Sequence, residues 1–313
     1  LLKQNVATEA HDFAGGKLEL LMIKLEPNAK AINKTLEEVI ENFKHIDFRA
    51  LAIHRRQNTF IPKAHDVFKE GDLVYVITKP HAIKELMQLS GKTKFNINNV
   101  MIVGGGRVGK LTAKRLEDDL NIKLLESDKQ RCSELTNFLS DTMIINADAR
   151  NVDLLEEEGI KDMDAFIAVT DNTETNILTC LQAKSFGVKR TIAMVENIDY
   201  IDISQNIGID TIINKKLIAA SYMVRYTLGG NVSSLKCLSG IDADIVEFVV
   251  RDGAEVTNRP INRLDMPDGA IIGGIIRGED SYIATGNFQI QAEDRVVVLV
   301  LPKTIQEVEK LFR

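Results

Sequence analysis

The stretch Asn99-Val-Met-Ile-Val-Gly104-Gly-Gly106-Arg-Val-Gly109-Lys110 carries the most structural information in this chain. A short apolar run leads into a GxGxxG pattern, and a helical pattern follows at once. Such a glycine pattern is weak by itself, but a strand before it and a helix after it form the context that a dinucleotide-binding turn requires. We therefore expect a Rossmann βαβ unit to begin here.

The glycines of this turn have distinct predicted roles. Gly104 permits the tight turn, Gly106 lets the backbone approach a pyrophosphate, and Gly109 lets the helix pack closely against the strand. The backbone N–H groups of Arg107 and Val108, at the positive end of the helix dipole, are predicted to face the phosphates. The alternative is a glycine-rich turn without a ligand.

An acidic residue ends the second expected strand. Glu126 lies 20 residues after Gly106, where a carboxylate accepts hydrogen bonds from the adenosine ribose hydroxyls and repels a 2′-phosphate. NAD(H), ATP and ADP therefore fit this residue better than NADP(H). Because all three carry the same ribose and pyrophosphate, the pattern leaves NAD(H) and ATP/ADP as alternatives, with NAD(H) preferred.

Small and polar residues follow the later strands. Asp148 and Ala149 come after the third expected strand, and Thr170 comes after the fourth. The carboxyl ends of parallel strands form the edge where ligands bind, so we expect Asp148 near the adenine and Thr170 near the phosphates or nicotinamide. Asp171 and Asn172 suit this edge and a helix N-cap equally well.

Residues 93–231 alternate β-branched runs with helical patterns, which predicts a doubly wound parallel sheet of the α/β class. The expected strands are Asn99–Val103, Ile122–Glu126, Thr142–Asn146, Ala165–Val169, Thr191–Val195 and Thr211–Ile213. The expected helices include Val108–Leu120, Lys129–Leu139 and Thr173–Phe186. Gly159 and Gly187 are expected just past helix ends.

The two flanks, residues 1–92 and 232–313, resemble each other. Three pairs lie 222 residues apart: Phe60 and Tyr282, Asp72 and Asp294, Glu85 and Glu307. Earlier in the repeat, Asn33 matches Asn258 at an offset of 225, so the length changes by three residues in between. Alternating strands with Gly, Asp and Asn turns, among them a charged hairpin at 55–58, predict two small α+β lobes with antiparallel sheets.

Composition excludes several classes of protein. The net charge is −6 without a long basic run, so we expect no nucleic-acid partner. No apolar stretch is long enough for a membrane span, and the three separated cysteines are typical of a reducing compartment. We expect a cytoplasmic protein without direct membrane insertion. Because the chain begins at Leu1 within an apolar pattern, we also expect it to be a fragment.

Catalytic groups are scarce around the expected nucleotide site. All five histidines lie in the first flank, and none lies in residues 97–313. The Tyr75-Val-Ile-Thr-Lys79 match lies in an expected strand outside the Rossmann segment, so we interpret it as chance. The sequence indicates neither catalysis nor a metal site, and an NAD-dependent oxidoreductase remains the alternative function.

Further motifs resemble those of the regulator-of-potassium-conductance family, also called the TrkA N-terminal domain family. They are the glycine turn, Asn146-Ala-Asp148-Ala, Leu155-Glu-Glu-Glu-Gly-Ile160, Asp164-Ala-Phe-Ile-Ala-Val-Thr170, Asn176, and Val195-Glu-Asn-Ile-Asp-Tyr200. Both flanks resemble the C-terminal domain of the same family, so the likeness covers essentially the whole chain.

The resemblance implies a regulatory protein with tandem Rossmann and lobe units, of which this chain lacks the first Rossmann domain. It implies self-association as a dimer or tetrameric ring, and an integral-membrane potassium-translocating partner that places the protein at the inner face of the membrane. The nucleotide-site residues that it carries over are Gly104, Gly106, Arg107, Val108, Gly109, Glu126, Asp148, Ala149 and Thr170.

Overall fold

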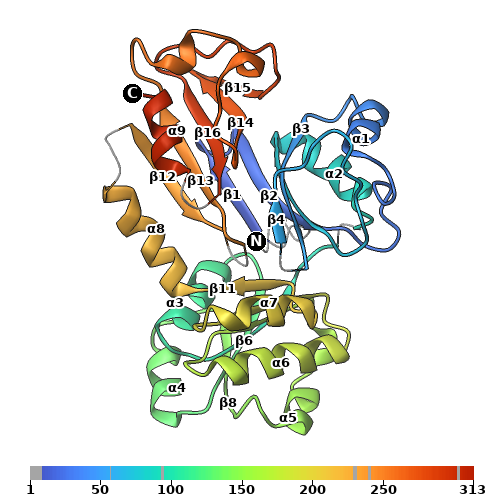
Figure 1. Ribbon diagram of the computed structural model, residues 1–313. Coiled ribbons are helices and arrows are strands. Elements are labelled where there is room, and N and C mark those ends of the chain that lie inside the picture. Colours follow the sequence, from blue (N-terminus) through green and yellow to red (C-terminus); the bar gives the residue numbers. More distant parts are fainter. Residues whose placement is uncertain (1–8, 57, 93–94, 228–230, 239–240, 302–303) are drawn as a thin grey trace. The chain divides into compact units, whose positions relative to one another are not determined.

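The computed structural model contains three sheets, each with its own helices (Figure 1). It describes residues 9–56, 58–92, 95–227, 231–238, 241–301 and 304–313. These residues form two compact units. One consists of residues 95–216, and the other combines the described residues before and after it, from 9 to 92 and from 217 to 313.

The unit of residues 95–216 is built on a six-stranded parallel sheet of strand order β11-β10-β9-β6-β7-β8. Its strands are β6 (Asn99–Val103), β7 (Asn121–Glu126), β8 (Thr142–Asn146), β9 (Ala165–Ala168), β10 (Arg190–Met194) and β11 (Thr211–Ile213). The chain adds strands on one side of β6 and then crosses to β9 on its other side. This reversal creates a switch point between β6 and β9, where α/β sheets bind ligands.

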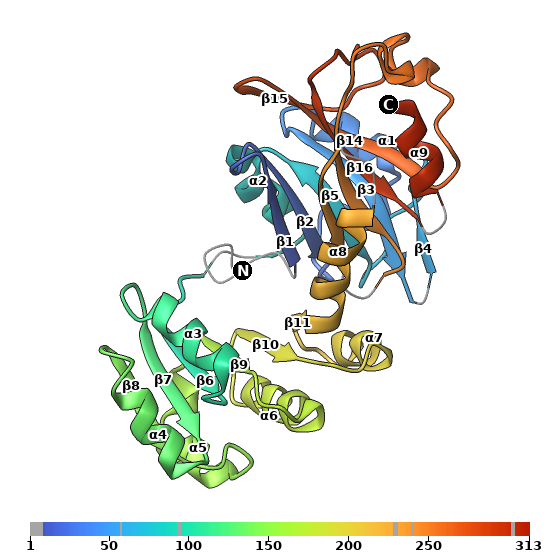
Figure 2. The same cartoon turned by 90° about the vertical axis from the view of Figure 1, so that its left-hand side faces the viewer.

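Helices connect these strands. They are α3 (Arg107–Leu116), α4 (Lys129–Thr136), α5 (Val152–Glu157) with the short η2 (Ile160–Asp162), α6 (Thr173–Ser185) and α7 (Asp199–Asn206). α3 contacts β6 and β7, whereas α6 contacts β9 and β10 (Figure 2). Right-handed crossovers that run in opposite directions from the switch point place helices on both faces, so the sheet is doubly wound.

The expected α/β fold is confirmed, with small differences at element ends. All six expected strands form within one residue of the expected bounds. The helix expected over Val108–Leu120 ends at Leu116, and the one expected over Lys129–Leu139 ends at Thr136, where the chain continues in turns. Gly159 and Gly187 follow helix ends with φ angles of 77° and 91°, which glycine adopts without steric cost.

The N-terminal lobe is a five-stranded antiparallel sheet of order β1-β2-β5-β3-β4 with two helices. Its elements are β1 (Glu9–Phe13), β2 (Leu18–Lys24), α1 (Leu36–Asn42), β3 (Phe48–Arg55), β4 (Asn58–Phe60), β5 (Leu73–Thr78), η1 (Pro80–Ala82) and α2 (Ile83–Leu89). The hairpin expected at 55–58 joins β3 to β4, with Arg56 at a φ of 59°; its residue 57 lies outside the described residues.

The C-terminal lobe has the corresponding strand order, β12-β13-β16-β14-β15. Its elements are β12 (Val232–Cys237), β13 (Asp244–Val249), η3 (Glu255–Thr257), η4 (Ile261–Arg263), β14 (Ala270–Arg277), β15 (Asp280–Ile283), β16 (Arg295–Val300) and α9 (Ile305–Leu311). α8 (Lys215–Thr227) leads into this lobe. Two η helices stand where the N-terminal lobe has α1, so the duplication preserves the sheet better than this connection.

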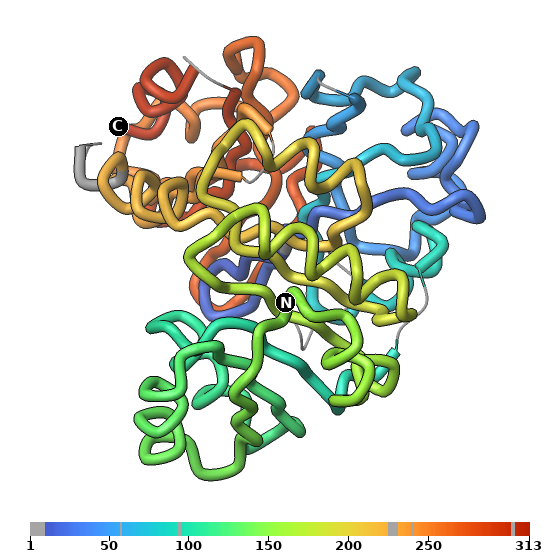
Figure 3. Tube along the Cα trace, turned by 90° about the horizontal axis from the view of Figure 1, so that it is seen from below, coloured from blue at the N-terminus to red at the C-terminus, as the bar shows by residue number. Residues whose placement is uncertain are grey.

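The two lobes share a hydrophobic core. One face of each sheet contributes to it: Leu20, Tyr75 and Ile77 from the N-terminal lobe lie in the same cluster as their counterparts Ile245, Val297 and Leu299. Segments from the two ends of the chain, blue and orange in Figure 3, therefore belong to one compact unit. The opposite face of each sheet packs in a core of its own, with α2 or α9.

The expected division at 92/93 and 231/232 stays a prediction. Both boundaries fall at or beside residues outside the described ranges. Among the described residues, no helix has the length and apolar character needed to cross a membrane.

Candidate functional site

The glycine turn connects the central strand β6 to α3. Gly104 has a φ of 99°, and a side chain there would meet the Thr170 backbone nitrogen at 2.9 Å. A Cβ on Gly109 would lie 1.8 Å from the Gly104 carbonyl oxygen, so only glycine allows α3 to start this close to the strand. A Cβ on Gly106 would meet nothing within 4 Å. Gly106 thus leaves open space in front of the turn.

Gly105, which the sequence pattern leaves unassigned, has its own packing reason. A Cβ at this position would lie 2.4 Å from Leu135 Cδ1 and 3.1 Å from Glu126 Oε2. Its backbone N–H donates a 2.8 Å hydrogen bond to the Glu126 carboxylate. The glycine turn and the acidic end of β7 are therefore one hydrogen-bonded structure.

Glu126 is almost fully buried, at 6% exposure. Oε1 accepts from the Asp128 backbone N–H at 2.9 Å and from the Ser127 hydroxyl at 3.4 Å. Oε2 accepts from Gly105 N–H and lies 3.5 Å from Nη1 of Arg131. The carboxylate thus has two short backbone donors and two longer side-chain donors.

Asp148 follows β8 and forms an ion pair with Arg150. The guanidinium meets the carboxylate in a fork, with Nη2 at 2.6 Å and Nε at 3.0 Å and 3.1 Å. This hydrogen-bonded cation lowers the pKa of Asp148, so the group carries its negative charge throughout the neutral range. The expected approach of Asp148 to an adenine stays a prediction, and Arg150 now stands beside it.

Thr170 follows the carboxyl end of β9 and is hydrogen-bonded to the buried Asn176 of α6. The Thr170 N–H and hydroxyl donate to Asn176 Oδ1 at 2.9 Å and 2.7 Å, and Asn176 Nδ2 donates to the carbonyls of Thr170 and Met194. Asn176 thereby joins the ends of β9 and β10. Of the two candidate caps, Asn172 is the N-cap of α6, where its side chain accepts from the Thr175 N–H.

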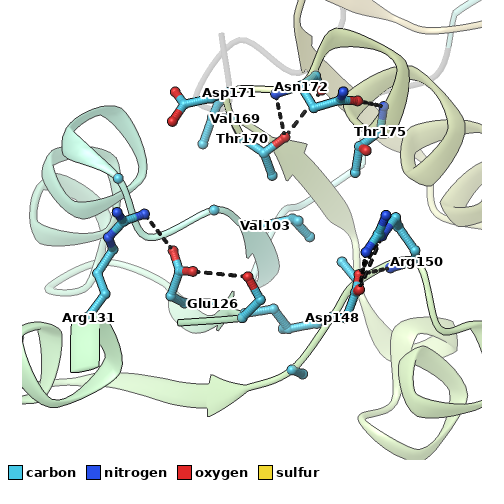
Figure 4. A pocket seen from close by; sticks show the side chains of 16 residues that line it. Val103, Glu126, Arg131, Asp148, Arg150, Val169, Thr170, Asp171, Asn172 and Thr175 are labelled. Carbon is cyan, nitrogen blue, oxygen red and sulfur yellow. Dashed lines mark hydrogen bonds and ion pairs between the residues drawn. The ribbon is translucent and has the colours of Figure 1, made fainter. Parts of the chain in front are cut away.

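Many of these groups line one cavity of about 450 Å³ at the carboxyl edge of the sheet (Figure 4). Among the predicted site residues, the lining includes Gly104, Gly106, Glu126, Asp148, Ala149 and Thr170. Figure 4 shows Glu126 and Asp148 at separate places along this edge, each beside an arginine. The structure therefore brings residues from the ends of four strands, β6, β7, β8 and β9, to one cavity.

Three predicted residues are outside this lining: Arg107, Val108 and Gly109. Gly109 is buried beneath Gly104, Val108 packs against the hydrophobic core of the sheet, and Arg107 is exposed at the first turn of α3. Their contacts with a ligand stay predictions.

Arg131 and Arg150 also line the cavity, and sequence reasoning missed both. In the sequence, the one indication of their role was that each follows an acidic residue at a strand end by a few positions: Arg131 follows Glu126, and Arg150 follows Asp148.

A second crevice of about 550 Å³ adjoins the cavity at the ends of β9 and β10. It shares Asp171 and Asn172 with the first cavity, and its polar lining includes Asn197, Tyr200 and Lys216. Among the described residues, no cluster of three or more His, Cys, Asp or Glu groups has a metal-binding arrangement.

The lining fits an adenine nucleotide. Open space in front of Gly106 allows a phosphate near the backbone, and the N-terminal turn of α3 supplies N–H groups and a positive dipole end. Glu126 offers carboxylate oxygens in the position of the ribose acid.

Comparison with known proteins agrees with this architecture. The TrkA-N domain model matches residues 100–215, and the TrkA-C domain model matches residues 20–91 and 245–313. The chain is 32% identical over 316 residues to Trk system potassium uptake protein TrkA homolog 2 of Methanosarcina mazei, with 100% of this chain and 70% of that protein covered. The chain belongs to the TrkA family. The resemblance stated from the sequence motifs is confirmed.

Other relatives carry the same name. The Trk system potassium uptake protein TrkA of Vibrio alginolyticus is 30% identical and that of Halomonas elongata 28% identical, each covering 100% of this chain and 69% of the relative. The TrkA-C match to both flanks accounts for the internal repeat.

Solved structures share the fold. The crystal structure of the GsuK RCK domain has a TM-score of 0.50 at 16% identity, covering 98% of this chain and 68% of that chain. The GsuK channel bound to NAD has a TM-score of 0.50 at 16% identity, with 98% and 56% covered. At this identity, the likeness concerns the fold alone.

Proposed function

We propose that this chain is a regulatory part of a potassium uptake system that binds an adenine nucleotide and performs no chemistry on it. The relatives named as Trk potassium uptake proteins support the system. The observation that carries nucleotide binding is the single cavity in which the glycine turn, Glu126 and Thr170 meet. A bound nucleotide can shift the equilibrium between two conformations of the protein only by the difference in its affinity for those conformations.

NAD(H) is the preferred ligand in this proposal, with ATP or ADP as the alternative. The cavity has room for an adenosine half, and the adjoining crevice shares Asp171 and Asn172 with it. A second nucleotide half extending past β9 would lie there. ATP or ADP would leave that crevice without a nucleoside.

The cavity supports a sensor better than an oxidoreductase. No His, Lys, Tyr or Cys is among the described residues that line it. Its acidic groups are the carboxylates Glu126, Asp148 and Asp171, and the first two already accept hydrogen bonds from neighbouring arginines. The crevice beside it does contain Tyr200 and Lys216, and these are the groups that an NAD-dependent oxidoreductase would have to use.

We propose an integral-membrane, TrkH-like potassium-translocating subunit as partner, with the chain peripheral at the cytoplasmic face of the membrane. Self-association as a dimer or tetrameric ring forms part of the same proposal. Ile203 on α7 and Ile207 at its C-cap, one turn further along and also about half exposed, support an interface at this helix.

Calorimetric titration with NADH, NAD⁺, ATP and ADP tests the proposal. We expect micromolar binding of at least one of them, weakened about tenfold or more by Glu126→Gln because a charged acceptor for the ribose hydroxyls is lost. Glu134→Gln, an exposed acid on the same helix as Arg131, is the matched control and should bind as wild type.

Two results would overturn the proposal. Absence of binding by all four nucleotides would remove the sensor role from this cavity. Turnover of NADH with a carbonyl substrate, abolished by Tyr200→Phe, would establish the oxidoreductase instead.

A further inference from the structure

The four donors to Glu126 differ in a way that bears on ligand choice. The Gly105 and Asp128 backbone N–H groups are at 2.8 Å and 2.9 Å and belong to the fold itself. The Ser127 hydroxyl and the Arg131 guanidinium are at 3.4 Å and 3.5 Å, longer than the usual hydrogen-bond distances. A ribose hydroxyl can therefore replace these side-chain donors while the backbone donors hold the carboxylate in place.

The backbone of Arg131 is fixed in a helix, whereas its guanidinium group is free to change partners. Its backbone N–H donates to the N-cap Asp128 at 3.2 Å, which anchors the residue in the first turn of α4. Its side chain is 46% exposed and lines the cavity beside the buried Glu126. Figure 4 shows the guanidinium directed toward the Glu126 carboxylate. A guanidinium has five N–H donors, so it can serve a second anion at the cavity mouth.

Among the described residues near Glu126, Arg131 is the positive charge that is available to an anion in the cavity. Glu126 and Asp128 are negative, and Asp128 already caps the first N–H groups of α4. Lys129 is exposed on the same turn and is absent from the cavity lining. Arg150 is forked onto Asp148, which neutralises that pair. Arg131 is thus the cation that lines the cavity next to the position of the ribose acid.

We propose that Arg131 makes the site tolerant of a phosphate on the adenosine ribose, so that NADP(H) binds as well as NAD(H). The inference rests on the proposed nucleotide function of this cavity. A carboxylate alone repels a 2′-phosphate, whereas an arginine at this place accommodates it. On binding of NADP(H), the guanidinium leaves the long contact with Glu126 and pairs with the phosphate in a bidentate manner.

Calorimetry with NADH and NADPH on wild type, Arg131→Gln and Lys129→Gln tests this inference. We expect wild type to bind the two ligands within about tenfold of each other. Arg131→Gln should weaken NADPH binding about ten- to a hundredfold, the size of a lost charge-assisted contact, and leave NADH within about threefold. Lys129→Gln, which removes a cation from the same turn, should change neither affinity by more than about threefold.

The outcomes separate the inference from the function on which it rests. If wild type binds NADH and rejects NADPH, the inference is wrong and the nucleotide site stands. If Arg131→Gln weakens both ligands equally, Arg131 only positions Glu126, and the inference is again wrong. If wild type binds neither NADH nor any other adenine nucleotide, both proposals fall. Adenosine 2′,5′-bisphosphate and AMP should reproduce the NADPH and NADH pattern, because they differ only in the 2′-phosphate.

Discussion

The two lobes of this chain are copies of one fold that differ where they touch each other. β3 pairs with β5 in the same register as β14 with β16, with an irregularity between Ala50 and Ala52 in one and between Ile272 and Gly274 in the other. The buried ion pairs also correspond. Arg55 forks onto Asp72, and Arg277 forks onto Asp294, each 222 residues further along.

At the face where the two lobes meet, corresponding positions carry different types of residue. Met22 and Leu73 of the N-terminal lobe pack in or against the interlobe core, and their counterparts in the C-terminal lobe are the ion pair Glu247 and Arg295. Gly274 stands where the other lobe has Ala52. Each lobe needs its own strand register and buried pair to fold, whereas each interlobe face needs only to complement the other. The two copies therefore kept the same strand register and buried ion pair, whereas their interlobe faces diverged.

The largest expected effect tests the conserved ion pairs. Asp72→Ala and Asp294→Ala should each lower the free energy of unfolding by about 2 to 4 kcal/mol, because each leaves a partly buried guanidinium and a backbone N–H without their acceptor. Urea denaturation measures the change, and the exposed Asp252→Ala serves as control. A large loss in one lobe and none in the other would break the equivalence.

Gly274→Ala should have an intermediate effect. The added Cβ would lie 2.6 Å from Leu18 Cδ1 of the other lobe and 3.2 Å from the Tyr282 carbonyl oxygen. Overpacking of this kind costs about 1 to 3 kcal/mol. The opposite change at the corresponding position, Ala52→Gly, removes a methyl group and should cost about 1 kcal/mol. If thermal unfolding shows Gly274→Ala to be as stable as wild type, the two faces are not closely fitted at this point.

The Glu247–Arg295 ion pair, on the interlobe face of the C-terminal lobe, should be replaceable by its N-terminal counterparts, Met22 and Leu73. Glu247→Met alone leaves Arg295 without its carboxylate and should cost about 1 to 2 kcal/mol, whereas adding Arg295→Leu should bring stability back within about 1 kcal/mol of wild type. A double-mutant cycle measures the coupling. Additive losses from the two substitutions would show that the positions do not act as a pair.

The smallest effect concerns Asp244, the counterpart of Glu19. Burial raises the pKa of the Asp244 carboxyl above its unfolded value of roughly 3.9. The folded state therefore binds the proton more tightly, and stability falls as the pH rises through the folded pKa. Asp244→Asn should give a small gain in melting temperature at pH 7 that vanishes below the unfolded pKa. Asp252→Asn, on an exposed residue that does not contribute to the Asp244 pKa, should follow wild type at both pH values.

Much of the fold was predictable because its signals are local. The glycine turn, the six apolar strand segments and the glycines after helices depend on residues close together in the chain, and all appear where expected. Helix ends were less accurate. Leu116 and Thr136 end α3 and α4 earlier than the apolar pattern suggested, since the following turns still bury apolar residues such as Leu139.

The candidate site was predictable in part for the same reason. Gly104, Glu126 and Thr170 follow strands, and strand ends in a parallel sheet meet at one edge. Nothing in the spacing showed that Gly105 donates to Glu126 or that Asn176 joins two strand ends, because those contacts depend on side-chain direction and on packing between elements.

The sequence by itself determined the order of strands and helices, the place of the glycine turn and the 222-residue repeat, since periodicity and turn chemistry act over a few residues. Only the tertiary structure decided which side chains lie in contact with one another. It placed Arg131 against Glu126, occupied Asp148 with Arg150, and joined the first and last lobes in one core. The shared core depends on contacts between segments up to the whole chain apart, whereas the two arginine contacts are close in sequence and depend on side-chain direction. No local pattern records either.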